Sequence, residues 1–210
     1  MRERRADSAG ERLLQQRYDT RQRAAAFYRE QLLDHLNADM RRFIGRMEMV
    51  FVATADAGGA CDCSLRAGLP GFVRVLDERT LAYPEYRGNG VLASQGNILE
   101  NGQIGLMFVD FLDSTVGLHV NGAAVVVENA DAVARPGGHL LAPDIAVQGG
   151  RRPERWIWVD IHEAYIHCSK HIPLLAKLDK SIAWGTDDRV LKGGDYFGAS
   201  ADRRGRRAGS

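Results

Sequence analysis

Residues 48–66 read EMVFVATADAGGACDCSLR, and this stretch decides the fold class. Residues 48–55 form a nearly continuous apolar run with β-branched and aromatic side chains, and a glycine-rich stretch at 56–59 follows. Residues 60–66 then alternate small and polar side chains. Two strand patterns around a glycine-rich turn predict a β-hairpin. The spacing predicts a second hairpin over 72–83, with its turn at 77–79.

Further strand patterns follow the two hairpins. They lie at 103–111, 115–128 and 155–168. Gly117 and Gly122 are candidate bulges or close-approach points in the second of them. Six or seven short strands in succession favour an antiparallel barrel with flanking helices over a parallel sheet. The chain lacks the βαβ alternation and the GxGxxG motif of a Rossmann fold.

Helical patterns lie before, between and after the strands. Apolar residues recur at three- and four-residue spacing over 21–46, which predicts an amphipathic helix with a break near Asn37. Shorter helices are predicted over 88–100 and 172–178. Residues 129–153 are poorly patterned and are predicted to be a surface excursion.

Charge divides the 210-residue chain into three parts, although its net charge is only +1. Residues 1–30 carry eight Arg against five acidic residues, and 199–210 carry four Arg against one Asp. The body between them has five more acidic than basic residues, which argues against a nucleic-acid-binding face. We predict an N-terminal arm at 1–20 that is mobile or docked on a partner, a domain at 21–185, and a basic tail at 186–210.

The sequence predicts a cytoplasmic protein with free thiols. It has no run of about 20 apolar residues that would span a bilayer, and its basic start lacks the apolar core of a secretory signal. Three cysteines, an odd number, favour reduced thiols in the cytosol. Cys61 and Cys63 lie on one face of their predicted strand, where we expect small buried thiols, and Cys168 is the third.

Two clusters have the chemistry to bind an anion. Arg66 ends a predicted strand before a Gly/Pro loop, where its guanidinium can hold a ligand bidentately; the alternative is an ordinary surface arginine. Arg87, Gly88 and Asn89 precede a predicted helix, whose N–H groups and dipole favour a phosphate. The alternative there is an ordinary capped helix.

A third cluster, HCSKH at 167–171, lies after the last predicted strand. A metal site from these residues with Cys61 and Cys63 lacks the usual ligand spacing. No G-x-S-x-G motif supports a serine hydrolase. His119 and His167 are the better candidates for acid–base roles, although a structural histidine is the commoner outcome for each.

Together the motifs occur in an order that resembles the FMN-binding split barrels of the pyridoxamine 5′-phosphate oxidase-like family. The resemblance covers roughly residues 30–185. Its motifs are FVATAD at 51–56, CSLRAG at 63–68, PGFV at 70–73, LDERTLAYP at 76–84, RGN at 87–89, GNILEN at 96–101, GL at 105–106, LHVNG at 118–122 and HCSK at 167–170. Several motifs in the same order make the resemblance more specific than any one of them alone.

The resemblance implies a six-stranded antiparallel split β-barrel that forms a homodimer, with FMN between the protomers. The implied contacts are as follows: Ser64 and Arg66 at the ribityl phosphate or flavin edge, Tyr83 and Pro84 along the isoalloxazine, Arg87, Gly88 and Asn89 around the phosphate, Asn97 as a polar contact, and Ser169 with Lys170 closing the site, with the partner chain as one source of these two.

The resemblance also implies an FMN-dependent oxidoreductase with a small-molecule substrate and NAD(P)H as a candidate electron donor. The chain lacks the Arg-x-x-x-x-Lys run, the Ser-x-Lys phosphate loop and the Arg-rich end of true pyridoxamine phosphate oxidases. These departures argue against vitamin B6 oxidation and leave the substrate open. The alternatives are a split barrel for a deazaflavin or haem, and a non-catalytic flavin-binding interaction module that recruits a partner through the basic termini.

Overall fold

The first predicted hairpin is present in the computed structural model, which describes residues 7–208. It pairs β1 (Met49–Ala55) with β2 (Cys61–Ala67) in antiparallel register, Met49 opposite Ala67 and Ala55 opposite Cys61. The turn closes where the Asp56 side chain accepts a hydrogen bond from the backbone N–H of Ala60 at 2.8 Å. Gly59 in this turn has φ of +87°, a conformation that glycine adopts without strain.

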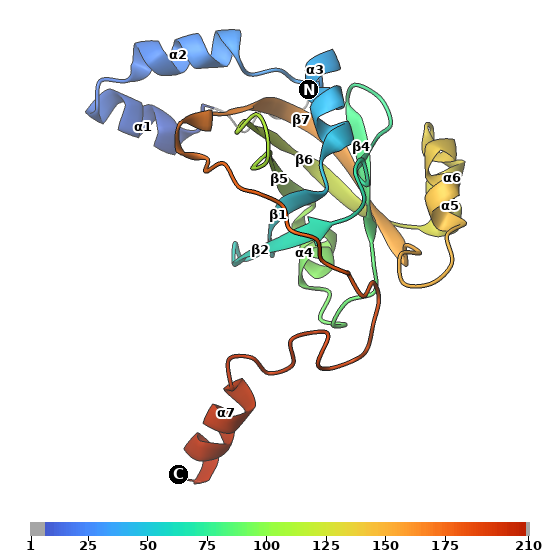
Figure 1. The fold of residues 1–210 in the computed structure, drawn as a ribbon. Coiled ribbons are helices and arrows are strands. Elements are labelled where there is room, and N and C mark those ends of the chain that lie inside the picture. Colours follow the sequence, from blue (N-terminus) through green and yellow to red (C-terminus); the bar gives the residue numbers. More distant parts are fainter. Residues whose placement is uncertain (1–6, 209–210) are drawn as a thin grey trace.

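All seven strands form one antiparallel sheet in the order β2-β1-β5-β6-β7-β4-β3 (Figure 1). The remaining strands are β3 (Arg74–Val75), β4 (Thr80–Glu85), β5 (Gln103–Val109), β6 (Gly117–Glu128) and β7 (Arg155–His167). The prediction of a mainly β, antiparallel fold is confirmed. The sheet has seven strands where the resemblance implies six, and β2 and β3 remain as its two edges, so it is not closed.

The long strand β6 confirms both glycine predictions. The pairing of β6 with β7 shifts register between Asn121 and Gly122, as a β-bulge does. A Cβ on Gly122 would lie 2.1 Å from the carbonyl oxygen of Asp160, so the close approach of the two strands requires glycine. At the start of β6, a Cβ on Gly117 would lie 2.7 Å from Cβ of His167.

The helix predicted over 21–46 is divided as expected. Its two parts are separated by residues 31–37, where Leu33 exchanges backbone hydrogen bonds with Ala164 of β7. Asn37 caps the second part, its side chain accepting from the N–H of Met40 at 2.9 Å. The helices are α1 (Ala9–Arg17), α2 (Arg21–Glu30), α3 (Ala38–Arg46), α4 (Ala93–Asn101), α5 (Asn129–Ala134), α6 (Ala142–Ile145) and α7 (Ala199–Ala208), with 3-10 helices η1 (Gly138–Leu141) and η2 (Ser169–His171).

Two local predictions are wrong. Residues 172–178 form no helix: Pro173 lacks an N–H and restricts Ile172 to extended backbone, while the N–H of Leu175 donates to the carbonyl of Phe111 at 2.7 Å. Residues 129–153 are more than a surface excursion, because they contain α5, η1 and α6. Leu141 of η1 packs with the buried Trp156 of β7 in a small second core.

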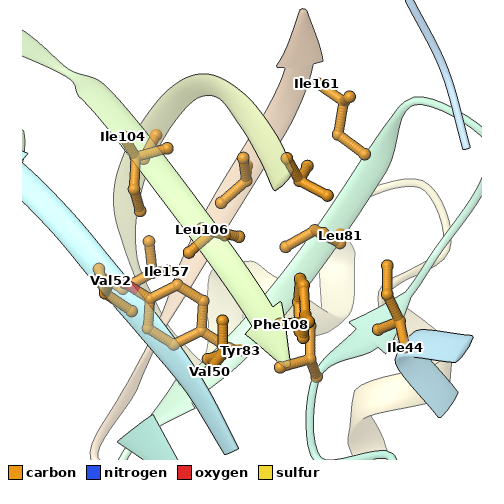
Figure 2. Close-up of a cluster of buried hydrophobic side chains, with 14 of the residues drawn as sticks. Ile44, Val50, Val52, Leu81, Tyr83, Ile104, Leu106, Phe108, Ile157 and Ile161 are labelled. Carbon is orange, nitrogen blue, oxygen red and sulfur yellow. The ribbon is translucent and has the colours of Figure 1, made fainter. Parts of the chain in front are cut away.

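The main core lies between the inner faces of the strands and helix α3. Figure 2 shows the side chains that meet there, with strands β1, β4, β5 and β7 contributing most of them. The labelled residues are Ile44, Val50, Val52, Leu81, Tyr83, Ile104, Leu106, Phe108, Ile157 and Ile161. Within residues 7–208, no helix combines the length and apolarity needed to cross a bilayer.

Candidate functional site

A cavity of about 570 Å³ lies where β2, the end of β4 and the start of α4 meet. Strand β2 lines it with Asp62, Ser64 and Arg66, which point to one face of the strand, and with Leu65 and Ala67 near the strand's end. Glu85 enters from the end of β4, and the loop at 86–92 forms the rim. We call this the rim cavity.

The rim cavity includes the N-terminus of α4. The N-cap residue, Leu92, has φ of +56°, and no side chain caps the helix. The positive end of the helix dipole and the N–H groups of the first turn therefore have no capping carboxylate or hydroxyl. Just before them, Asn89 accepts a hydrogen bond from the N–H of Val91 at 3.0 Å, and Gly90 has φ of +79°. This arrangement suits an anion.

Arg66 provides a positive charge in the rim cavity and forms an ion pair within it. Its Nε lies 2.9 Å from Oε1 of Glu85, and the side chains are 22% and 7% exposed. Burial raises the pKa of Glu85, and the charge of Arg66 opposes that rise. Arg155 adds a second positive charge near Glu85 and donates to Gln95 of α4 at 3.0 Å.

A hydroxyl network joins β2 to the first turn of α4. The Oγ atoms of Ser64 and Ser94 lie 2.9 Å apart, and the hydroxyl of Ser94 donates to Asp62 at 3.0 Å. This network fixes the helix start relative to the strand. It also places two hydroxyl groups beside the uncapped N–H groups of α4.

The C-terminal segment closes one side of the rim cavity. Figure 1 shows this segment, in red, passing the loop before α4. Trp184 lines the cavity and packs edge-on against Tyr86, with ring centroids 5.4 Å apart. The carboxylate of Asp187 lies 2.5 Å from the Arg87 guanidinium, and Lys192 lies 3.9 Å from the same carboxylate group. A carboxylate of the chain itself thus pairs with one of the predicted phosphate-binding arginines.

The rim cavity brings together five of the ten predicted site residues. These are Ser64, Arg66, Arg87, Gly88 and Asn89. They meet there because one strand and the loop before one helix carry all five.

The other five predicted residues lie elsewhere. Tyr83 and Pro84 are buried in β4, and the Tyr83 hydroxyl has no hydrogen-bond partner in the core (Figure 2). Asn97 of α4 donates to the Thr54 hydroxyl at 3.0 Å. Ser169 and Lys170 are exposed in η2, which follows the end of β7 opposite to the end that pairs with Glu85.

The sequence reasoning missed several cavity residues. The position of Asp62 in the cavity could have been predicted, because Asp62 shares its strand face with Ser64 and Arg66. The position of Glu85 could also have been predicted, since Glu85 lies on the same face of β4 as Leu81 and Tyr83. No sequence pattern predicts the positions of Trp184 and Asp187. They lie in a segment of turns and irregular backbone and reach the cavity only through tertiary contacts.

The expectation of buried thiols at Cys61 and Cys63 is wrong. Both are exposed, although they do share one strand face, because β2 is an edge strand of the sheet. All three cysteines are free, as predicted. No group of three or more His, Cys, Asp and Glu in the described part of the chain is placed to hold a metal ion.

The two candidate histidines face each other across β6 and β7. Nε2 of His119 lies 2.9 Å from Nδ1 of His167, and the His119 ring stacks on Tyr165 with centroids 4.7 Å apart. Burial lowers the pKa of His119, and the neighbouring His167 lowers it further. Neither histidine lines the rim cavity.

Comparison with known proteins identifies one family. The model of the family described as "Pyridoxamine 5'-phosphate oxidase" matches residues 36–168, more than half of the chain. No curated protein matches the chain.

Solved structures with a similar fold include three named proteins. HupZ of Group A Streptococcus is 23% identical with a TM-score of 0.47, and the match covers 62% of this chain and 93% of that one. HutZ, the heme storage protein from Vibrio cholerae, is 16% identical with a TM-score of 0.39, covering 62% and 94%. An FMN-binding protein from Syntrophomonas wolfei is 11% identical with a TM-score of 0.44, covering 76% and 97%.

Proposed function

Because the chain belongs to the pyridoxamine 5′-phosphate oxidase family, we propose that it is a flavoprotein that binds FMN in the rim cavity. The observation that carries the proposal is an uncapped helix N-terminus that shares one cavity with Arg66 and Arg87. We further propose an oxidoreductase acting on a small molecule, in a homodimer with the cofactor at the interface. The cytoplasmic location and NAD(P)H as electron donor stay predictions from the sequence.

The residues of the rim cavity fit a phosphate monoester. Such a group carries close to two negative charges and three acceptor oxygens near neutral pH. The loop at 87–90 and the first turn of α4 supply backbone N–H groups, and Arg87 supplies a guanidinium at the rim. Asp187 already places a carboxylate at that guanidinium, which is direct evidence in this chain that an anion can reach it.

The cavity also fits the size and the flat body of a flavin. Its volume of about 570 Å³ is within the range of small-molecule sites, about 300–1,000 Å³. Tyr86 and Trp184 place two aromatic side chains at one side, where a ring system can pack.

When bound, FMN would supply hydride transfer, and the chain would supply binding and electrostatics. Arg66 is already held by Glu85, so it contributes a fixed charge rather than a mobile one. Ser64 and Ser94 hold the helix start in place through Asp62. No histidine among the described residues lines the rim cavity, so arginine, carboxylate, hydroxyl, aromatic and backbone groups would surround the ring.

A visible spectrum tests the proposal directly. We expect the purified protein, or the protein after FMN is added, to show flavin absorbance that stays with it during gel filtration. Protein that is colourless and does not bind added FMN would contradict the proposal. The same spectrum distinguishes a deazaflavin or haem from FMN. Anaerobic addition of NADH and NADPH then tests the non-catalytic alternative, in which the bound flavin is not reduced.

The Arg87→Ala variant is expected to weaken FMN binding by about 1–3 kcal/mol, the usual range for losing a charge-assisted contact. Arg87 is 59% exposed, so its loss should leave the fold intact. The measurement is an FMN fluorescence-quenching titration, with Arg42→Ala as the matched control because Arg42 is exposed on α3 and paired locally with Asp39. An unchanged affinity would place the phosphate away from this loop.

The Asp187→Asn variant should bind FMN more tightly than the wild type. Asp187 competes with a phosphate for the Arg87 guanidinium, and the amide removes that competing charge while keeping the shape. Exposed ion pairs contribute about 0–1 kcal/mol, so the gain should be at most about fivefold. FMN binding should also become more dependent on salt in the variant, because salt no longer weakens a competing ion pair at the same time as it weakens the phosphate contact. Weaker binding would instead show that Asp187 orients Arg87 for the ligand.

A further inference from the structure

A second cavity, of about 680 Å³, lies on the outward face of the sheet beneath α1 and α2, and we call it the lid cavity. Figure 1 shows these two helices, in blue, beside the sheet at the end of β7. Strand β1 lines the lid cavity with Phe51 and Ala53, whereas its neighbours Val50 and Val52 point into the core. Cys63 of β2 lies in the lid cavity, and Ser64 lies in the rim cavity. The two cavities are therefore separate.

The walls of the lid cavity are rich in aromatic rings. Helix α2 contributes Phe27 and Tyr28, and the sheet contributes Phe51 and Tyr165. Phe27 meets Tyr165 edge-on with ring centroids 5.7 Å apart, so the helix and the sheet are joined at this wall. The Tyr28 hydroxyl accepts a hydrogen bond from Gln15, which connects α1 to α2 above the cavity.

The charges that line the lid cavity are negative. Among residues 7–208, its lining includes the carboxylates of Glu163 and Glu11 and neither lysine nor arginine. Glu163 is only 2% exposed, and its Oε1 accepts a hydrogen bond from Asn121 at 2.9 Å. Burial and the neighbouring His167 lower the pKa of His119, and the charge of Glu163 opposes that shift.

We propose that the lid cavity binds an organic cation with an apolar or aromatic body, such as an alkyl- or arylammonium compound. Aromatic faces attract cations, and a carboxylate in a partly dry site strengthens that attraction. The rim cavity differs from the lid cavity, since Arg66, Arg87 and the N-terminus of α4 line it together with two carboxylates. This proposal does not depend on FMN binding.

Calorimetric titration of the full chain with three probes of similar size tests the charge preference. The probes are benzyltrimethylammonium, benzyl alcohol and benzenesulfonate. We expect the cation to bind at least tenfold more tightly than the alcohol, and the sulfonate to bind most weakly. Equal affinities, a preference for the sulfonate, or no binding of the cation would overturn the proposal.

Variants then locate the binding. Glu163→Gln keeps the side-chain shape and should weaken cation binding on the order of tenfold. Glu128→Gln is the matched control, because it removes the same charge from an exposed position of β6 outside the cavity. Phe27→Leu tests the aromatic wall independently and should weaken binding several-fold. Wild-type affinity in both cavity variants would overturn the assignment.

Thiol alkylation gives a test that needs no variant. Cys63 lines the lid cavity, whereas the exposed Cys168 does not. Saturating benzyltrimethylammonium should slow alkylation of Cys63 by iodoacetamide, read by mass spectrometry, and leave the rate at Cys168 unchanged. Equal rates at Cys63 with and without the cation would contradict binding at this site. FMN affinity should be the same in Glu163→Gln as in the wild type. The proposal of cation binding and the proposal of FMN binding can therefore fail independently of each other.

Discussion

Replacing Arg66 by Ala is expected to lower the free energy of unfolding by about 3 kcal/mol near neutral pH, the lower end of the range for a buried ion pair that loses one partner. The loss arises at Glu85, which is 7% exposed and would keep its charge without its closest partner. The nearby charge of Arg155 remains, which is why we expect the lower end of the range. Urea unfolding of the variant and the wild type measures the difference.

The cost of Arg66→Ala should depend on pH. Burial already raises the pKa of Glu85 above its unfolded value of 4.5, and the loss of Arg66 raises it further. The folded variant therefore binds this proton more tightly than the unfolded chain does. The stability that the variant loses relative to the wild type is largest above the pKa of Glu85 in the folded variant. This loss shrinks as the pH falls through that pKa towards 4.5. A deficit that is constant over this window would show that Glu85 is not its source.

A double variant distinguishes the structural role of Arg66 from its proposed role in binding. In Arg66→Ala/Glu85→Gln the buried charge is gone, so most of the lost stability should return. FMN affinity should remain below that of the Glu85→Gln single variant, because the guanidinium is still missing. If affinity returned together with stability, Arg66 would act only by holding the fold.

The Phe108→Ala variant is expected to lower the free energy of unfolding by about 4 kcal/mol, as truncation of a fully buried phenylalanine does. Phe108 is 0% exposed and lies in the main core from β5 (Figure 2). The cost combines the lost burial of the ring with the space that it leaves. Urea unfolding monitored by circular dichroism gives the value.

Phe197→Ala is the matched control for Phe108→Ala. Its ring is 92% exposed near α7, so its truncation should change stability by less than about 0.5 kcal/mol. If Phe108→Ala lowered the free energy of unfolding no more than the control does, the ring of Phe108 would not contribute to the core.

The hairpins could be predicted because their signals are local. The apolar run before the turn at 56–59 and the alternation after it specify two strands whatever the rest of the chain does. The same alternation assigned Cys61 and Cys63 correctly to one face. It could not give their exposure, since that depends on which strand lies at the edge of the sheet.

The candidate site was predictable where one strand and one loop carry it. Arg87 and Asn89 lie in the loop directly before α4, and Arg66 lies at the end of β2, so their positions follow from those two elements. Tyr83 was placed by the resemblance at the flavin, whereas its strand face turns it into the core, with Glu85 next on that face. Contacts such as Asp187 with Arg87 join residues 100 positions apart through irregular backbone, and no periodicity reports them.

Strand β2 lies between the two cavities: Cys63 lines the lid cavity, whereas Asp62 and Ser64 beside it line the rim cavity. Changes at 62, 64 and 66 alter the site with the arginines, whereas a change at 63 alters the wall beneath the two N-terminal helices. Neighbouring residues of one short strand therefore face two different cavities, and a substitution at 63 can change one wall without changing the other. Inserting one residue before Asp62 would turn each of these side chains to the opposite face of the strand.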